Sequence, residues 1–140
     1  MVSQTLLNLP ASGPGLHEIT AEVADIVSQS DIACGTCHVF VQHTSASLLI
    51  QENADPSARA DLETFFERLA PHGAAWYTHT TEGADDMPAH LRAALTNTSE
   101  LIPVVGGRLG LGTWQGLYLF EHRDRARGRR VVVTISGDSR

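Results

Sequence analysis

Histidines and carboxylates gather in two stretches of this 140-residue sequence. The first stretch opens with His43 and closes with Glu52, Asn53 and Asp55. The second spans twelve residues and holds two imidazoles and three carboxylates, those of His79, Glu82, Asp85, Asp86 and His90. Neutral imidazole is the commonest metal ligand, and a catalytic zinc site takes three protein ligands and keeps one open position. These residue types are therefore compatible with a divalent-metal site, although no local pattern such as HExxH fixes its ligands.

Three histidines are the candidate ligands, and they would have to meet through the fold because they lie on separate predicted elements: His43, His79 and His90. Imidazoles favour zinc, whereas a hard cation such as magnesium would prefer the neighbouring carboxylates of Glu52, Asp55, Glu82 and Asp85. The alternative interpretation is that all of these are surface and helix-capping residues with satisfied hydrogen bonds.

The elements that position the first stretch follow from its apolar pattern. The triplet Leu48-Leu49-Ile50 predicts a buried strand. Asp55 is placed to cap a helix in which Pro56 takes the first position. That helix should run over residues 57–70, with an apolar stripe made by five residues: Ala58, Leu62, Phe65, Phe66 and Leu69.

The remaining pattern predicts one domain over residues 1–140, of the α+β class. It would be a β-rich sandwich of mostly antiparallel strands with about three flanking helices. Thr20 should cap a first helix ending near Gln29, and Asp85 or Asp86 a third one from Pro88 to about Leu95. Further strands are expected over 3–9, 16–19, 36–42, 75–80, 101–105, 109–120 and 131–135. The arginine-rich run 123–130 should be a solvated hairpin loop, with Arg123, Arg125, Arg127, Arg129 and Arg130 at its tip.

Composition excludes several classes of function. With ten basic and sixteen acidic residues the net charge is −6, which argues against nucleic-acid binding. No apolar run approaches the roughly 20 residues of a membrane span, and the N-terminus lacks the features of a signal peptide. We therefore expect a cytoplasmic protein without a nucleic-acid or membrane partner. The string Cys34-Gly35-Thr36-Cys37-His38 matches a haem-attachment pattern, but two reduced thiols are the simpler interpretation.

A glycine-rich run over residues 106–116 has too many glycines for an ordinary strand. Glycine in a strand marks a bulge or the close approach of a ligand or another backbone. Thr113, Trp114 and Gln115 add a hydroxyl, a stacking surface and an amide. The run lacks the GxxxxGK[ST] pattern of a phosphate loop, so a bent strand and a binding strand both stay open.

Three motifs, in this order, closely resemble the YjbQ-like family: HTSASLLIQENADP, EGADDMPAH and GRLGLGTWQGLYLFEHR. The resemblance covers nearly the whole chain. Members of this family are described as secondary thiamine-phosphate synthases, which join a hydroxymethylpyrimidine diphosphate to a thiazole phosphate and release pyrophosphate. The resemblance thus implies a small phosphorylated substrate, a β-rich sandwich and a homotrimer.

The resemblance also implies a set of site residues. Catalytic roles fall on Glu52, Asn53, Asp55 and Glu82. Substrate-binding roles fall on Thr44, Gly112, Thr113, Trp114 and Gln115, and metal-binding roles on His43, His79 and His90, with zinc or magnesium as the cofactor. Two other functions stay open: a metal-dependent hydrolase with Glu52 or Glu82 as the base that activates water, and a non-catalytic trimer that binds a small ligand.

Overall fold

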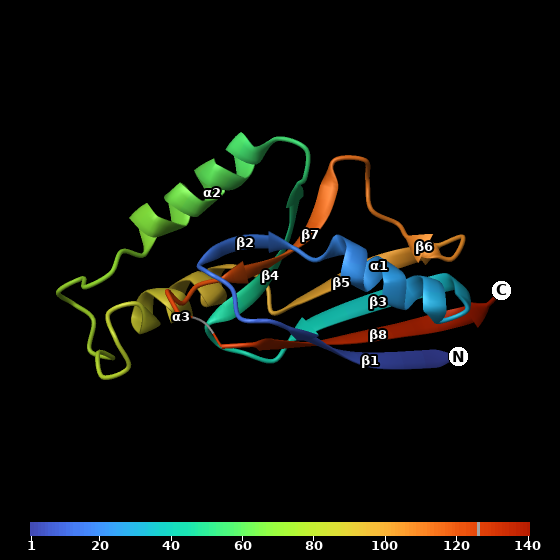
Figure 1. The fold of residues 1–140 in the computed structure, drawn as a ribbon, viewed down its shortest axis with the longest axis horizontal. Coiled ribbons are helices and arrows are strands. Elements are labelled where there is room, and N and C mark those ends of the chain that lie inside the picture. The colour runs from blue at the N-terminus through green and yellow to red at the C-terminus, as the bar shows by residue number, and fades with distance from the viewer. Residues whose placement is uncertain (126) are drawn as a thin grey trace.

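The computed structural model describes residues 1–125 and 127–140, which form eight strands and three helices (Figure 1). None of these helices is long and apolar enough to cross a membrane, as far as the described residues go. In chain order the elements are β1 (Val2–Leu9), β2 (Gly15–Glu18), α1 (Thr20–Gln29), β3 (Ile32–Val41), β4 (Ala46–Glu52), α2 (Pro56–Leu69), α3 (Asp86–Leu95), β5 (Ser99–Val105), β6 (Arg108–Leu109), β7 (Gln115–Glu121) and β8 (Arg129–Ser139).

The strands build two antiparallel sheets, which confirms the predicted α+β fold. A five-stranded sheet has the order β1-β8-β3-β5-β6, and a three-stranded sheet has the order β2-β7-β4. In the larger sheet Cys37 of β3 pairs with Ile135 of β8 on one side and with Ile102 of β5 on the other. All three side chains are buried, so this register places one face of the sheet against the core.

The main core lies between the two sheets and under α1. It combines alternate residues of β3, such as Val39 and Val41, with Val23 and Val27 of α1 and with Leu48 of β4. A second, smaller cluster lies on the other face of the three-stranded sheet and is formed by Leu16, Tyr118 and Phe120, with Leu49, Leu62 and Phe66 packed against it. The three-stranded sheet is thus covered on both faces, and α2 packs on the outer one.

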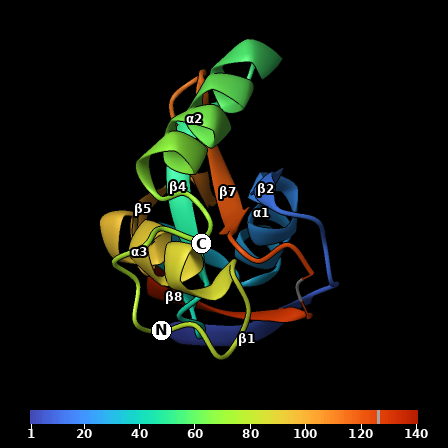
Figure 2. The ribbon, with the colours of Figure 1, turned by 90° about the vertical axis from the view of Figure 1, so that its left-hand side faces the viewer.

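Helix α2 begins as predicted but is far less buried than its pattern suggests. The Asp55 carboxylate accepts a hydrogen bond from the Ser57 N–H at 2.9 Å, and Pro56 takes the first helical position. None of the residues of α2, all of them described, is buried. Phe65 and Leu69 of the predicted apolar stripe stay 55% and 53% exposed. The helix stands out from the sheets, as Figures 1 and 2 show.

Three predictions about elements were wrong. Residues 75–80 form turns and irregular chain instead of a strand. The predicted strand over 109–120 is split into β6 and β7, and the loop between them passes close to β5, with the Gly110 N–H donating to the Pro103 carbonyl at 2.7 Å. Thr20 does not cap α1, since its hydroxyl instead accepts from the Leu117 N–H at 2.9 Å.

The arginine-rich segment also differs from the prediction. Arg129 is not solvated at a hairpin tip but buried at the start of β8, where its Nε donates to Glu121 Oε1 at 2.7 Å. Its NH2 donates to the hydroxyl and the carbonyl of Ser45. Arg125, Arg127 and Arg130 are exposed, and position 126 of the predicted loop lies outside the described residues.

This burial generates a stability prediction. Replacing Arg129 by leucine removes the guanidinium partner of the Glu121 carboxyl group, which is 1% exposed in the wild type. We expect the free energy of unfolding to fall by about 3–5 kcal/mol, measured by urea denaturation at pH 7. The matched control is Arg130→Leu, which removes an exposed neighbouring arginine and should change stability by no more than about 0.5 kcal/mol. Equal losses in the two variants would contradict the structural role assigned to Arg129.

Candidate metal centre

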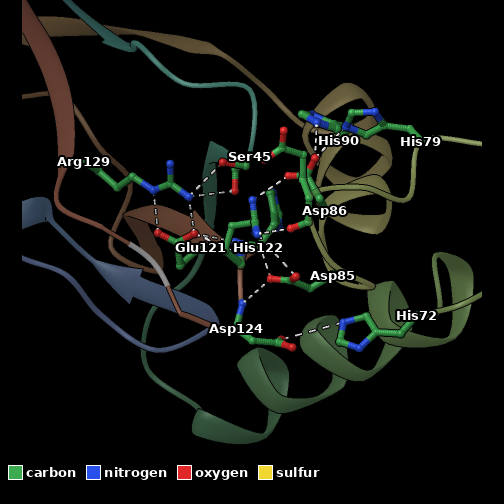
Figure 3. Close-up of polar contacts among 12 residues, drawn as sticks. Ser45, His72, His79, Asp85, Asp86, His90, Glu121, His122, Asp124 and Arg129 are labelled. Atoms are coloured by element: carbon green, nitrogen blue, oxygen red, sulfur yellow. Dashed lines mark hydrogen bonds and ion pairs between the residues drawn. The ribbon is translucent and has the colours of Figure 1, made fainter.

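Two imidazoles share one carboxylate oxygen at the end of the molecule that carries α3. The Nε2 atom of His79 lies 2.7 Å from Oδ2 of Asp86, and the Nε2 atom of His90 lies 3.1 Å from the same oxygen. One ligand atom from each of these residues lies within 4.8 Å of the other two. Figure 3 shows both rings turned toward the carboxylate.

The local sequence explains how these groups meet. Asp86 is the first residue of α3, and His90 follows four residues later, so both lie on the same face of the helix. His79 belongs to the irregular chain between α2 and α3, which folds back onto the helix start. The Asp86 side chain is only 6% exposed, whereas those of His79 and His90 are 45% and 31% exposed.

The two contacts of the His90 ring indicate which of its nitrogens carries a proton. Its Nδ1 atom lies 3.1 Å from the carbonyl oxygen of Thr44, which can only accept, so Nδ1 carries a proton. A neutral imidazole has one N–H, so the Nε2 lone pair would then face the Asp86 carboxylate. This pairing is stable only if Nε2 is also protonated or if a cation lies between the two atoms. A histidine that donates its second N–H to a carbonyl is also the usual arrangement around a bound metal.

An arginine holds the Asp86 carboxylate from the other side. Arg123, just beyond β7, donates from NH1 to Asp86 Oδ1 at 2.7 Å and from Nε to Asp85 Oδ2 at 2.8 Å. Burial acts to raise the pKa of Asp86, but hydrogen bonds from His79 and His90 and the charge of Arg123 outweigh it and lower that pKa. The pKa of Asp85 is also lowered, since the bonds from Arg123 and the Asp124 N–H outweigh its burial. Asp86 is therefore ionised and oriented at neutral pH.

The donor set fits a divalent transition metal. Two imidazole nitrogens and one carboxylate oxygen are the three protein ligands of a typical catalytic zinc site. Their softness favours zinc over magnesium, which prefers an all-oxygen shell. The exposed sides of His79 and His90 leave room for a further ligand. Predicted ligands His79 and His90 are thus brought together, with Asp86 beside them.

His43 is not one of the residues whose ligand atoms converge here, within the described part of the chain. Its Nε2 accepts a hydrogen bond from the Arg130 N–H at 2.9 Å, so that nitrogen already has a partner. Burial lowers the pKa of His43, and the charges of Arg129 and Arg130 act in the same direction. His43 is therefore neutral near pH 7, with its proton on Nδ1. It shares with His90 the wall of a cavity of about 690 Å³.

Most of the other predicted site residues lie at the far end of β4. This strand runs from Ala46, beside His43, to Glu52, a path of roughly 20 Å at 3.3 Å per residue. The Glu52 carboxylate accepts from the Asp55 N–H at 2.8 Å, and Asp55 caps α2. Asn53 donates from its N–H to the Trp114 carbonyl at 3.1 Å. Within one chain these residues form a group separate from the histidines.

The glycine-rich loop belongs to this second group. Gly112, Thr113 and Gln115 line a cavity of about 430 Å³ that also touches Asn53 and α1. The Gln115 side chain accepts from the Gly112 N–H at 2.8 Å, and Trp114 is 64% exposed. Close approach occurs at Gly116, where a Cβ atom would lie 2.7 Å from the Glu18 carboxylate. Of the predicted substrate-binding residues, Thr44 alone lines the same cavity as His43 and His90.

Sequence analysis missed two residues that complete the histidine site. Asp86 was interpreted as a helix cap, although its spacing of four from His90 on a predicted helix was a usable signal. Arg123 was placed among solvated arginines, and nothing in the sequence indicates that it reaches α3 from the end of β7. Predicted Glu82 lies near this site through its carbonyl, which accepts from Arg123 NH2 at 3.0 Å, while the residue itself is exposed.

Comparison with known proteins places this fold and sequence in one group. A family model described as UPF0047 protein YjbQ-like matches residues 5–138. A UPF0047 protein of Synechocystis sp. is 53% identical over 135 residues, which cover 96% of this chain and 92% of that protein. UPF0047 protein YjbQ of Escherichia coli O157:H7 is 42% identical over 136 residues, with 96% and 98% covered.

Solved structures agree with this assignment. A YbjQ-like protein of unknown function from Sulfolobus solfataricus P2 superposes with a TM-score of 0.90 at 27% identity, with 99% of both chains covered. An uncharacterised protein of the YjbQ/UPF0047 family from Clostridium acetobutylicum has a TM-score of 0.85 at 35% identity, covering 94% of this chain and 99% of that one.

The contacts of Arg123 generate a pH-dependent prediction. Arg123→Leu leaves two adjacent ionised carboxylates without their guanidinium, so the free energy of unfolding at pH 7 should fall by about 1–3 kcal/mol. The folded-state pKa values of Asp85 and Asp86 are lowered, so this stabilisation exists above their ordinary pKa and disappears as the pH falls through the lowered values.

Urea denaturation at pH 7 and at about pH 3 checks this dependence. The difference between the variant and the wild type should shrink at the lower pH, which lies below the ordinary pKa of these carboxyls. Arg125→Leu, at an exposed position two residues away, is the matched control and should match the wild type at both. A loss for Arg123→Leu that is the same at both values would show that packing, not charge, connects Arg123 to α3.

Proposed function

Because the chain belongs to the YjbQ-like UPF0047 family, we propose that it is a metal-dependent enzyme that acts on a small phosphorylated substrate. The reaction to test first is the transfer that the motif resemblance implies, in which a hydroxymethylpyrimidine diphosphate and a thiazole phosphate are joined with release of pyrophosphate. The proposed metal ligands are His79, Asp86 and His90.

One observation carries the metal-dependent part of this proposal. Both nitrogens of His90 face oxygens that only accept, the Thr44 carbonyl and the Asp86 carboxylate. His79 faces the same carboxylate oxygen. A divalent cation held by the three ligand atoms would remove this conflict without a second proton on the His90 ring. His79 needs no second proton in either case, because a neutral ring can donate from Nε2.

The chain's own groups suit a phosphorylated substrate. A divalent cation here, zinc or magnesium, supplies charge stabilisation for a departing pyrophosphate. Phe40, Ala93 and Ala94 are among the residues that line the cavity beside His90, and they supply apolar surface against which a planar ring could pack. His90 and Thr44 form a polar edge of this cavity. This edge adjoins the proposed metal site, because His90 is one of the proposed ligands.

A metal-dependent hydrolase is the second candidate, and solvent access favours it. His79 and His90 are both partly exposed, so water reaches the open side of the proposed metal site. Glu82 is exposed nearby, where it could serve as the base for water. Product analysis with the two thiamine precursors separates these reactions, because only the transfer yields thiamine phosphate.

A homotrimer is part of the proposal. The uncovered side chains of Phe65 and Leu69 on α2 and of Trp114 support self-association, since large exposed apolar surfaces mark interfaces. Assembly also offers a way to unite the two polar groups. A neighbouring chain could bring its Glu52–Asp55 segment and glycine-rich loop to the histidines, which lie at the opposite end of β4 in one chain. A cytoplasmic location is likewise proposed.

The metal site is tested by titrating the metal-free protein with zinc in a calorimeter. We expect one zinc per chain, and at least about tenfold weaker binding in Asp86→Asn, because the amide keeps the shape of the carboxylate but loses its charge. Thiamine-phosphate formation should fall in parallel. Asp124→Asn changes an exposed carboxylate near α3 and serves as the control. Unchanged zinc affinity in Asp86→Asn would rule out the proposed ligand set.

Asp55 allows a separate test of the second polar group. Asparagine caps a helix about as well as aspartate, so Asp55→Asn should fold and assemble normally. If Asp55 acts in catalysis or supports the metal, turnover should nevertheless fall about 10–100-fold at limiting metal. Turnover equal to that of the wild type, together with an intact oligomer in sedimentation, would restrict Asp55 to capping α2.

A further inference from the structure

The cavity beside the metal ligands has two ionisable groups in its wall. It occupies about 690 Å³ between the α3 face formed by His90, Ala93 and Ala94 and the chain that connects β3 to β4. Ligand pockets of proteins fall in this size range. The connecting chain contributes Thr44, whose carbonyl binds His90, and His43. His43 is thus an ionisable side chain in the wall of this cavity to which the proposed function assigns no role.

The backbone of β8 fixes the tautomer of His43. The Arg130 N–H donates to Nε2 at 2.9 Å, so Nε2 presents its lone pair and the single proton of the neutral ring is on Nδ1. Among the described residues, this Nδ1–H donates no hydrogen bond. Since His43 lines the cavity, an N–H donor is available beside the metal ligands.

We propose that the His43 Nδ1–H donates a hydrogen bond to an anionic oxygen of the ligand bound at the His79, Asp86 and His90 site. This inference rests on the proposed function and assigns His43 to recognition of a phosphate-bearing ligand, not to the metal. A ring fixed by a main-chain N–H presents its donor without reorganisation, which strengthens a hydrogen bond to charge.

Two isosteric substitutions separate the two nitrogens of His43. In His43→Asn the amide N–H₂ takes about the place of Nδ1–H, while the acceptor for Arg130 is lost. In His43→Gln the longer side chain can place its carbonyl near the position of Nε2, while the Nδ1 donor is lost. A role toward the ligand predicts rescue by asparagine, and a role toward Arg130 alone predicts rescue by glutamine.

The experiment uses Co²⁺ in place of zinc and inorganic phosphate as the probe ligand, with the visible Co²⁺ spectrum as the readout. We expect wild type, His43→Asn and His43→Gln to bind Co²⁺ with affinities within about threefold and with the same spectrum. Phosphate affinity of the cobalt-loaded protein should fall at least about tenfold in His43→Gln, and by less than about threefold in His43→Asn.

Each contrary result has a separate meaning. Equal phosphate affinity in His43→Gln and wild type overturns the inference and leaves the metal centre intact. A changed phosphate-free spectrum or lost Co²⁺ binding in His43→Gln also overturns it, because His43 would then be a metal ligand. If wild type binds no Co²⁺, the proposed metal centre fails and the inference with it.

Nitrogen-15 NMR of the metal-free protein gives an independent readout. The chemical shifts and couplings of the His43 ring report which nitrogen is protonated. The inference requires a neutral ring with its proton on Nδ1 at pH 7. A signal from protonated Nε2 would overturn it, because the ring would then have no N–H to offer from Nδ1 in its neutral form.

Discussion

The Asp86 carboxylate joins the parts of the molecule that would otherwise be separate. One of its oxygens contacts His79, from the irregular chain after α2, and His90, from α3. The other oxygen accepts a hydrogen bond from Arg123, which lies just beyond β7. The side chain is almost fully buried, so its charge needs these partners. A single ionised group thus orders the histidines and attaches α3 to the three-stranded sheet.

Local patterns were enough to predict much of the fold. The strand predicted over residues 36–42 is part of β3, in which Cys37, Val39 and Val41 face the core, because alternate side chains of a strand point to the same face. Asp55 and Pro56 correctly marked the start of α2. These features depend on neighbouring residues alone. The apolar stripe of α2 showed which side of the helix is apolar but could not show that no element of the chain covers Phe65 and Leu69.

The candidate site was only partly predictable for a similar reason. The sequence places His79, Asp86 and His90 within one twelve-residue stretch, but the predicted ligands were His43, His79 and His90. It could not show that Arg123 arrives from β7, or that Arg129 is buried against Glu121, since both contacts depend on the pairing of distant strands. The same limit applies to His43, which is close to His90 in space through Thr44 but has its Nε2 bound to the backbone of β8.

The position of a bound metal tests the account most directly. Anomalous diffraction at the zinc edge, on crystals of the full chain grown with zinc, locates the ion without reference to activity. The account predicts a peak at about 2.0–2.2 Å from His79 Nε2, His90 Nε2 and Asp86 Oδ2, with the His90 Nδ1–H still donating to Thr44. A zinc ion ligated by His43, or a fully ordered site in which both imidazoles bind Asp86 and no anomalous peak appears, would contradict it.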